Sequence, residues 1–147
     1  MKEKSFKKHA IQLEKIIVNE ASFKLVEFKG TPAIPNPKYF IGKSEYDKEN
    51  HIVSIGLMAK IEGEQFGYIC VVDIIGLFTI DESNFEVSKI DQWCDINAPY
   101  ILHPYLRQHL FNLTLNATGE GFLLPLIEVP TSGKAILKST EQQIIDK

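Results

Sequence analysis

The chain has 147 residues, of which 44% are hydrophobic and 24% charged, values that are typical of one globular domain. Sixteen Lys and Arg residues against nineteen Asp and Glu residues give a net charge of −3 at pH 7. This balance lacks the basic excess of most nucleic-acid-binding proteins, so no nucleic-acid partner is expected. A chain of this length buries roughly two-thirds of its unfolded surface, so a core is expected without disulfides or structural metals.

The start of the chain does not read as a targeting segment. After eight mostly charged residues, the apolar stretch is interrupted by Gln12, Glu14 and Lys15, whereas a signal peptide needs about seven to fifteen uninterrupted apolar residues. No stretch approaches the roughly twenty apolar residues of a membrane span. Cys70 and Cys94 are isolated, which predicts reduced core thiols. We therefore expect a cytoplasmic protein that does not insert into membranes.

The first predicted element is a long strand over residues 10–26. Apolar residues there fall on alternate positions, and a period of two marks a strand with one buried face. The alternation changes phase near Lys15 and Ile16, which predicts a β-bulge. Residues 27–50 are rich in Gly and Pro and predict an extended loop, with a short edge strand at residues 39–41.

A hairpin is the clearest pattern in the sequence. Over residues 53–61 apolar residues fall on alternate positions, with Ser54 and Lys60 between them. Gly63 marks a turn over residues 62–64, and a return strand is predicted over residues 66–80. The return strand is apolar at both even and odd positions, although one face of an antiparallel strand normally meets water. Its second face is therefore expected to be covered by another subunit or a partner.

The last third of the chain changes to a helical period. Residues 101–118 carry apolar residues at three- and four-residue spacing, with Pro104 in the first turns and Gly119 just past the end. The apolar arc is wider than one sheet needs to cover. A second, weaker helix is predicted over residues 132–145. Because the strands come first and the helices last, the fold class is α+β with helices on one sheet face.

The sequence contains no motif for nucleotide binding, zinc binding or hydrolysis. His103 and His109 are six residues apart, which is not the spacing of a helical metal pair. Asp91 and Asp95 are one helical turn apart, but a solvated helix face explains them better than catalysis. We therefore expect no enzyme and no cofactor, and an interaction surface instead. The aromatic residues in or beside loops that would form it are Phe23, Tyr39, Phe40, Trp93, Tyr100 and Phe122.

Several of these segments together resemble the SecB family of protein-export chaperones. Residues 68–80 (YICVVDIIGLFTI) resemble a family strand that ends in a Gly-hydrophobic-Phe-Ser/Thr-Ile block. Residues 97–107 (NAPYILHPYLR) are similar to the family's helix entry, which is the more specific motif. Residues 16–23 resemble the first strand, and residues 123–130 the return loop. The similarity spans about residues 10–138.

The resemblance implies a single domain over residues 1–147, with frayed tails at residues 1–9 and 139–147. It implies a SecB-like fold, in which a four-stranded antiparallel sheet is followed by two helices packed on one face. It also implies a homotetramer, built as a dimer of dimers with helices buried between the dimers. The residues expected at oligomer interfaces are Cys70, Val72, Ile74, Leu106, Leu110 and Leu113.

By the same resemblance, the protein is an ATP-independent holdase that binds unfolded polypeptides in hydrophobic grooves for protein export or transport. The family has no cofactor and no catalysis. Its grooves are lined by the loop after the first strand and by the second helix. The residues that match these client-binding positions are Tyr39, Phe40, Ile41, Ile136 and Leu137.

The family docks the translocase motor SecA through acidic residues and a leucine on the exposed sheet face. Glu20 keeps an acid and Ile69 an aliphatic side chain, but Lys24 and Val71 stand where the family has acids. A first alternative to export is a SecB-like chaperone of a toxin–antitoxin system, which protects an antitoxin. A second is an oligomeric scaffold or regulator that binds one folded partner.

Overall fold

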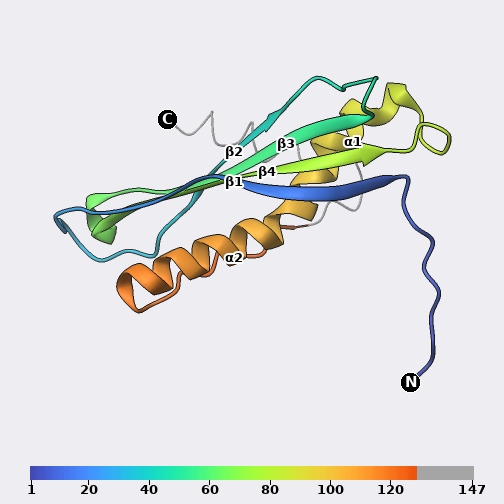
Figure 1. Ribbon diagram of the computed structural model, residues 1–147. Helices are drawn as coiled ribbons and strands as arrows, with labels where there is room; N and C mark the ends of the chain where they lie inside the picture. The colour runs from blue at the N-terminus through green and yellow to red at the C-terminus, as the bar shows by residue number, and fades with distance from the viewer. Residues whose placement is uncertain (129–147) are drawn as a thin grey trace.

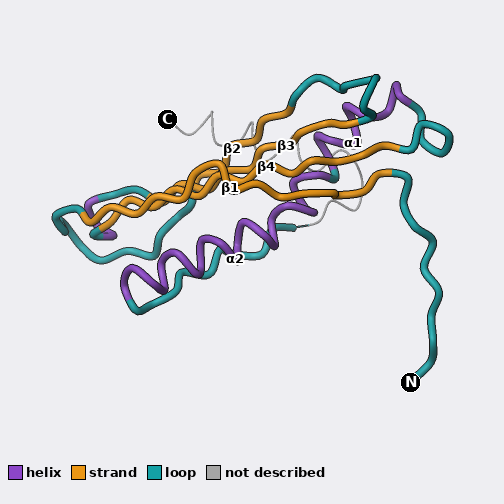
Figure 2. Tube along the Cα trace, in the orientation of Figure 1, coloured by secondary structure: helices purple, strands orange, loops and turns teal. Residues whose placement is uncertain are grey.

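The computed structural model describes residues 1–128, in which four strands form one antiparallel sheet (Figures 1 and 2). The strands lie in the order β1-β4-β3-β2, and the helices follow them in the chain. The fold is therefore the α+β class that the sequence predicts. The helix predicted over residues 132–145 lies outside the described residues, as do Ile136 and Leu137. The elements are β1 (Ile11–Leu25), β2 (Lys38–Lys43), β3 (Ile52–Ile61), β4 (Tyr68–Ile80), α1 (Ile90–Ile96) and α2 (Ala98–Thr118), with short 3₁₀ turns η1 (Glu64–Phe66) and η2 (Val87–Lys89).

Helix α2 crosses one face of the sheet, which we call the inner face; the opposite one is the outer face (Figure 1). The helix approaches β4 closely at Gly76, where a Cβ atom would lie 2.6 Å from Cδ2 of Leu102. The even-numbered residues of β4 therefore face α2, and from Cys70 onward they are buried, whereas the odd-numbered ones are only half-buried. The inner face and the helices enclose the core, whose largest fully buried side chains include Phe78, Ile55, Ile61, Ile74, Ile90, Leu102, Leu106 and Leu110.

Strand β1 contains two bulges. The register with β4 shifts between Leu13 and Lys15, which confirms the predicted bulge, and again between Val18 and Glu20, which the sequence analysis missed. Each shift leaves one extra residue on β1, so apolar side chains before and after it stay on the inner face. The imperfect alternation of the sequence is therefore compatible with one long strand.

The turn between β3 and β4 is longer than predicted. The chain forms η1 after Gly63, and Gly67 has a φ of 73°, a left-handed conformation that ends the turn and that glycine adopts without strain. Strand β4 consequently begins at Tyr68, two residues later than the predicted start at residue 66. The predicted edge strand is confirmed as β2, which lies at one end of the strand order.

Helix α2 begins at Ala98, three residues before its predicted start, directly after α1, which the sequence analysis did not propose as an element. Pro104 consequently lies inside α2 rather than in its first turns, and it deprives the carbonyl of Tyr100 of a helical partner. The C-terminal prediction is confirmed: Gly119 has a φ of 80° and its N–H donates to the Leu115 carbonyl at 2.9 Å. Within residues 1–128, neither helix is both long and apolar enough to cross a membrane.

Candidate functional site

The edge strand β2 carries three of the five residues predicted to bind clients. Tyr39 pairs with Ala59, Phe40 with Met58 and Ile41 with Leu57. Because successive strand residues point to opposite faces and Leu57 and Ala59 are buried core residues, Tyr39 and Ile41 face α2. Phe40 lies on the outer face. The three residues, which the resemblance predicts to bind clients together, therefore do not form one surface.

On the inner face, Tyr39, Ile41 and His103 form what we call the inner site. The rings of Tyr39 and His103 lie 5.9 Å apart at 46°, and Ile41 is 58% exposed. Tyr39 Oη and His103 Nε2 are buried, and neither has a hydrogen-bond partner among residues 1–128. Burial, assisted by the Arg107 guanidinium, lowers the pKa of His103, so the imidazole is neutral at pH 7. Two polar atoms thus lie beside an exposed apolar side chain.

The two ends of β2 are held by ion pairs. Lys43 Nζ lies 2.8 Å from Asp95 Oδ1 and 3.5 Å from Asp91 Oδ1 on α1. At the other end, Lys38 Nζ lies 3.4 Å from Glu62 Oε1. The hydrogen bond to Asp95 raises the pKa of Lys43. Both aspartates are exposed on a helix, as predicted, and they fasten the edge strand to α1.

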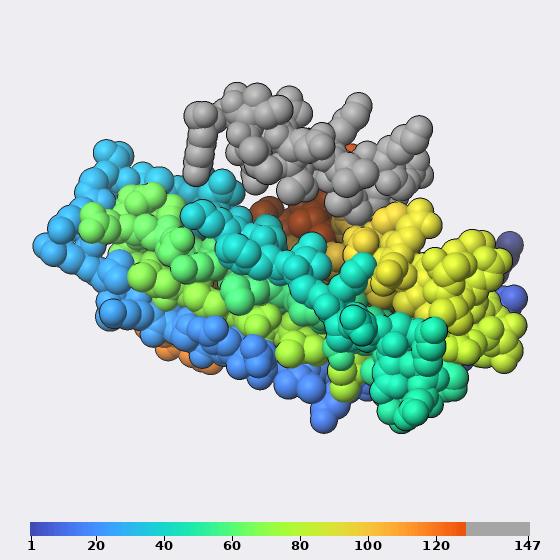
Figure 3. Space-filling model, turned by 90° about the horizontal axis from the view of Figure 1, so that it is seen from above, coloured from blue at the N-terminus to red at the C-terminus, as the bar shows by residue number. Residues whose placement is uncertain are grey.

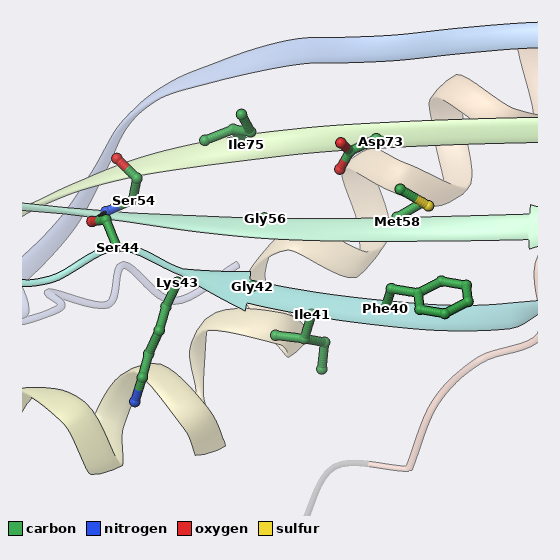
Figure 4. Close-up of a pocket in the computed structure, with 10 residues that line it drawn as sticks. All are labelled: Phe40, Ile41, Gly42, Lys43, Ser44, Ser54, Gly56, Met58, Asp73 and Ile75. Carbon is green, nitrogen blue, oxygen red and sulfur yellow. Dashed lines mark hydrogen bonds between the residues drawn. The ribbon is translucent and has the colours of Figure 1, made fainter.

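On the outer face, Gly42 pairs with Gly56, and a shallow groove of about 420 Å³ lies over the two glycines (Figure 4). Figure 4 shows Met58, Asp73 and Ile75 on one side of the sheet, and Ile41 and Lys43 pointing away toward the helices. We call this hollow the outer groove. Further lining residues are Phe40, which is 51% exposed, Ser44 and Ser54.

The predicted docking residues, Glu20 and Ile69, also lie on the outer face. Glu20 is the cross-strand partner of Asp73, and its carboxylate accepts a hydrogen bond from Ser22 Oγ at 3.0 Å. Ile69 is half-buried and pairs with Lys24, so a cation stands beside the aliphatic residue. The structure thus places both residues on an accessible face; their docking role remains a prediction.

The residues expected at oligomer interfaces lie in or beside the core of the single chain. Cys70, Val72, Ile74, Leu106 and Leu110 have no exposed surface, and Leu113 is half-buried against them. Burial raises the pKa of both thiols to about 11, and neither is in a disulfide, as expected of reduced core cysteines. The described chain itself covers five of the six predicted interface residues.

Two features of the site were missed from the sequence. The spacing of His103 from His109 argued against a metal pair, but it gave no sign that the His103 ring is buried beside Tyr39. The pairing of Gly42 with Gly56 was also missed, although glycine inside a strand is a recognised sign of an open or closely approached backbone. Among residues 1–128, no three His, Cys, Asp or Glu side chains are grouped to hold a metal ion.

No family model and no curated protein sequence matches the chain. Among solved structures, the Mycobacterium tuberculosis Rv1957 SecB-like chaperone, in complex with a ChAD peptide from the Rv1956 HigA1 antitoxin, is similar with a TM-score of 0.65 and 13% identity. The match covers 80% of this chain and 91% of that chain. A Streptococcus agalactiae protein of unknown function gives a TM-score of 0.45 and 15% identity, over 79% of this chain and 97% of that one. The likeness to Rv1957 shows that the chain has a SecB-like fold.

Proposed function

We propose that the protein is an ATP-independent holdase that binds non-native polypeptides along β2, at the inner site. The observation that carries this proposal is the exposed Ile41 beside Tyr39, on an edge strand whose two ends are fixed by ion pairs. The SecB-like fold, shared with a chaperone, supports it. No enzymatic activity and no cofactor are proposed, and the site of action is the cytoplasm.

The inner site offers two kinds of contact that suit an unfolded chain. Ile41 and the ring of Tyr39 present apolar area without fixed polar geometry, which accommodates many different side chains. The outer edge of β2, with which no strand of residues 1–128 pairs, presents backbone donors and acceptors that can pair with an extended segment. Tyr39 Oη and His103 Nε2, by contrast, are buried and have no hydrogen-bond partner among residues 1–128.

An antitoxin is the better supported client. The structurally similar Rv1957 is a SecB-like chaperone in complex with a peptide from an antitoxin. Export through SecA would rest on docking at Glu20 and Ile69. The family docks SecA through acidic residues, and Lys24 places a positive charge beside Ile69 instead, which disfavours that contact. We therefore place a toxin–antitoxin role ahead of export.

A tetramer remains part of the proposal. On α2, the apolar side chains of Ile101, Tyr105 and Leu115 are each about two-fifths exposed or slightly more. Obligate interfaces are large and apolar, so this exposed side of α2 supports packing of helices between dimers.

The decisive experiment is suppression of citrate synthase aggregation after dilution from denaturant, at equimolar protein and without nucleotide. We expect suppression by the wild type and a several-fold loss in Ile41→Ser, with an unchanged melting temperature because Ile41 is already exposed. Leu25→Ser is the matched control, since Leu25 is 73% exposed on the opposite edge strand β1. A wild type that binds only one folded protein and no unfolded chain would favour the scaffold alternative.

A further inference from the structure

On the outer face of the sheet, β4 contributes a stripe of apolar residues that only Asp73 interrupts between Ile69 and Leu77. Antiparallel sheets normally present polar residues on the face opposite their helices. In Figure 3 the sheet is seen from the side opposite α2, and its strands lie at the surface. Apolar faces of this extent mark contact sites. The half-buried apolar residues that β4 contributes are Ile69, Val71, Ile75 and Leu77.

The middle of this face has a ridge on one half and a hollow on the other. One cross-strand row reads Ile17, Ile75, Gly56 and Gly42 from β1 to β2. The two isoleucines project from β1 and β4, and the two glycines leave the outer groove open over β3 and β2. A Cβ at Gly42 would meet no atom within 4 Å, so nothing of the described chain fills this hollow.

We propose that the outer face binds the outer face of a second copy of this chain, around a two-fold axis that runs parallel to the strands between β4 and β3. Such an axis stacks β1 of one copy over β2 of the other. Each cross-strand row of one copy then lies over the same row of the other copy. Ile17 then faces the second copy's Gly42, and Ile75 faces its Gly56. Each ridge fills a hollow, which is the self-complementarity that a two-fold interface requires.

The charges on the same face are also self-complementary. Glu20 and Asp73 lie in the row beside the isoleucine–glycine row, and Lys38 and Lys60 lie in the next one. Around the proposed axis, Glu20 stands diagonally opposite the second copy's Lys38. In the same way, Asp73 stands diagonally opposite its Lys60. Acids of each copy thus approach lysines of the other, which favours this partner over a uniformly charged one.

The available area is sufficient for a specific contact. With about 3.4 Å per residue and about 4.8 Å between strands, the four strands give a face of roughly 700 Å² per copy. Specific interfaces bury about 800 Å² per partner. The outer face and the exposed side of α2 are on opposite sides of the chain, so contacts at both would extend an assembly beyond four chains. The proposal therefore predicts growth of the assembly with protein concentration.

Filling the hollow is the first test. Gly42 has no positive φ and its Cβ position is open, so Gly42→Val fits its own chain and favours the strand. We expect sedimentation velocity to show self-association about tenfold weaker or more, at an unchanged or higher melting temperature. Self-association that is unaffected by Gly42→Val overturns the proposal, as does a wild type that remains one protomer at all concentrations.

A compensating variant separates this geometry from a general surface effect. Ile17 and Gly42 lie on opposite edges of the sheet, about 14 Å apart, so they do not touch within one chain. The double variant Ile17→Ala, Gly42→Val should recover most of the association lost in Gly42→Val, because valine then faces alanine across the interface. Failure to recover argues against the proposed axis.

Chemical cross-linking between two chains tests the same pairing directly. Chains with Ile17→Cys and chains with Gly42→Cys are treated with a short bismaleimide, separately and mixed. The native cysteines are buried and should not react in the folded protein. We expect a cross-linked dimer chiefly in the mixture, because each introduced thiol faces the other position. Equal cross-linking in the separate samples, or none in the mixture, overturns the proposal.

Discussion

At the scale of single residues, Gly76 determines how closely α2 can approach the sheet. A Cβ at this position would lie 2.6 Å from Leu102 Cδ2 and 3.0 Å from Phe78 Cε2. We predict that Gly76→Ala lowers the free energy of unfolding by about 1–3 kcal/mol, because the core must shift to accept one methyl group. Thermal or urea unfolding measures the effect. Gly42→Ala is the matched control in another strand, where no loss is expected; equal losses would show that the Leu102 contact is not the cause.

His103 should make stability depend on pH. Its pKa in the folded protein is lowered from 6.5 by burial and by Arg107, so below pH 6.5 the unfolded chain binds a proton that the folded chain resists. The neutral ring stabilises the fold fully above pH 6.5. This contribution is lost as the pH falls from 6.5 toward the pKa of His103 in the folded protein. We predict a fall in unfolding free energy from pH 7 to pH 5 that is smaller in His103→Leu. Parallel profiles for the two proteins would contradict this assignment.

The site residues show what cannot be predicted without register. Phe40 and Ile41 were both predicted to bind clients through the resemblance to the SecB family, yet they lie on opposite faces of β2. The row from Ile17 to Gly42 joins residues from four strands, and only the pairing of the strands brings them together. Register depends on non-local contacts, so alternation within one segment does not reveal it.

At the scale of elements, the predictions succeeded where the periodicity was strong. The strand alternation and the terminal glycine of α2 were sufficient to locate β1, β3 and α2 within a few residues. Helix α1 has only seven residues and was missed, because two turns give too short a pattern to recognise. The second bulge of β1 was also missed, since one extra residue leaves little trace in an alternation already disturbed nearby.

The ion pairs between β2 and α1 should affect local order more than global stability. Lys43 contacts Asp91 and Asp95, which are well exposed, and such pairs contribute about 0–1 kcal/mol. We predict that Lys43→Met lowers the free energy of unfolding by less than about 1 kcal/mol but speeds amide hydrogen exchange in β2. Lys89→Met, which removes only the pair with Glu86, is the control and should leave β2 unchanged. Equal exchange in β2 for both variants would mean that the pairs do not fasten the strand.

At the scale of the whole molecule, the two faces of the sheet differ in what covers them. Helix α2 of the same chain covers the even-numbered residues of β4, which are buried from Cys70 onward, while Ile101, Tyr105 and Leu115 on its other side stay exposed. The odd-numbered residues stay on the outer face, where no described helix covers them. A strand that is apolar on both faces therefore reflects one contact within the chain and one face that the helices of residues 1–128 leave uncovered.

Two substitutions separate the effect of α2 on assembly from its effect on folding, one in the core and one on the exposed side of the helix. Val72 has no exposed surface, so Val72→Asp buries a carboxylate in the core and should unfold the chain rather than dissociate it. Leu115 is 40% exposed on α2, so Leu115→Asp should leave the melting temperature of the protomer nearly unchanged. If α2 packs between dimers, light scattering of Leu115→Asp at micromolar concentration should show a smaller species than the wild type. A wild type of protomer mass, or a Leu115→Asp variant of wild-type mass, would show that the exposed side of α2 is not an interface.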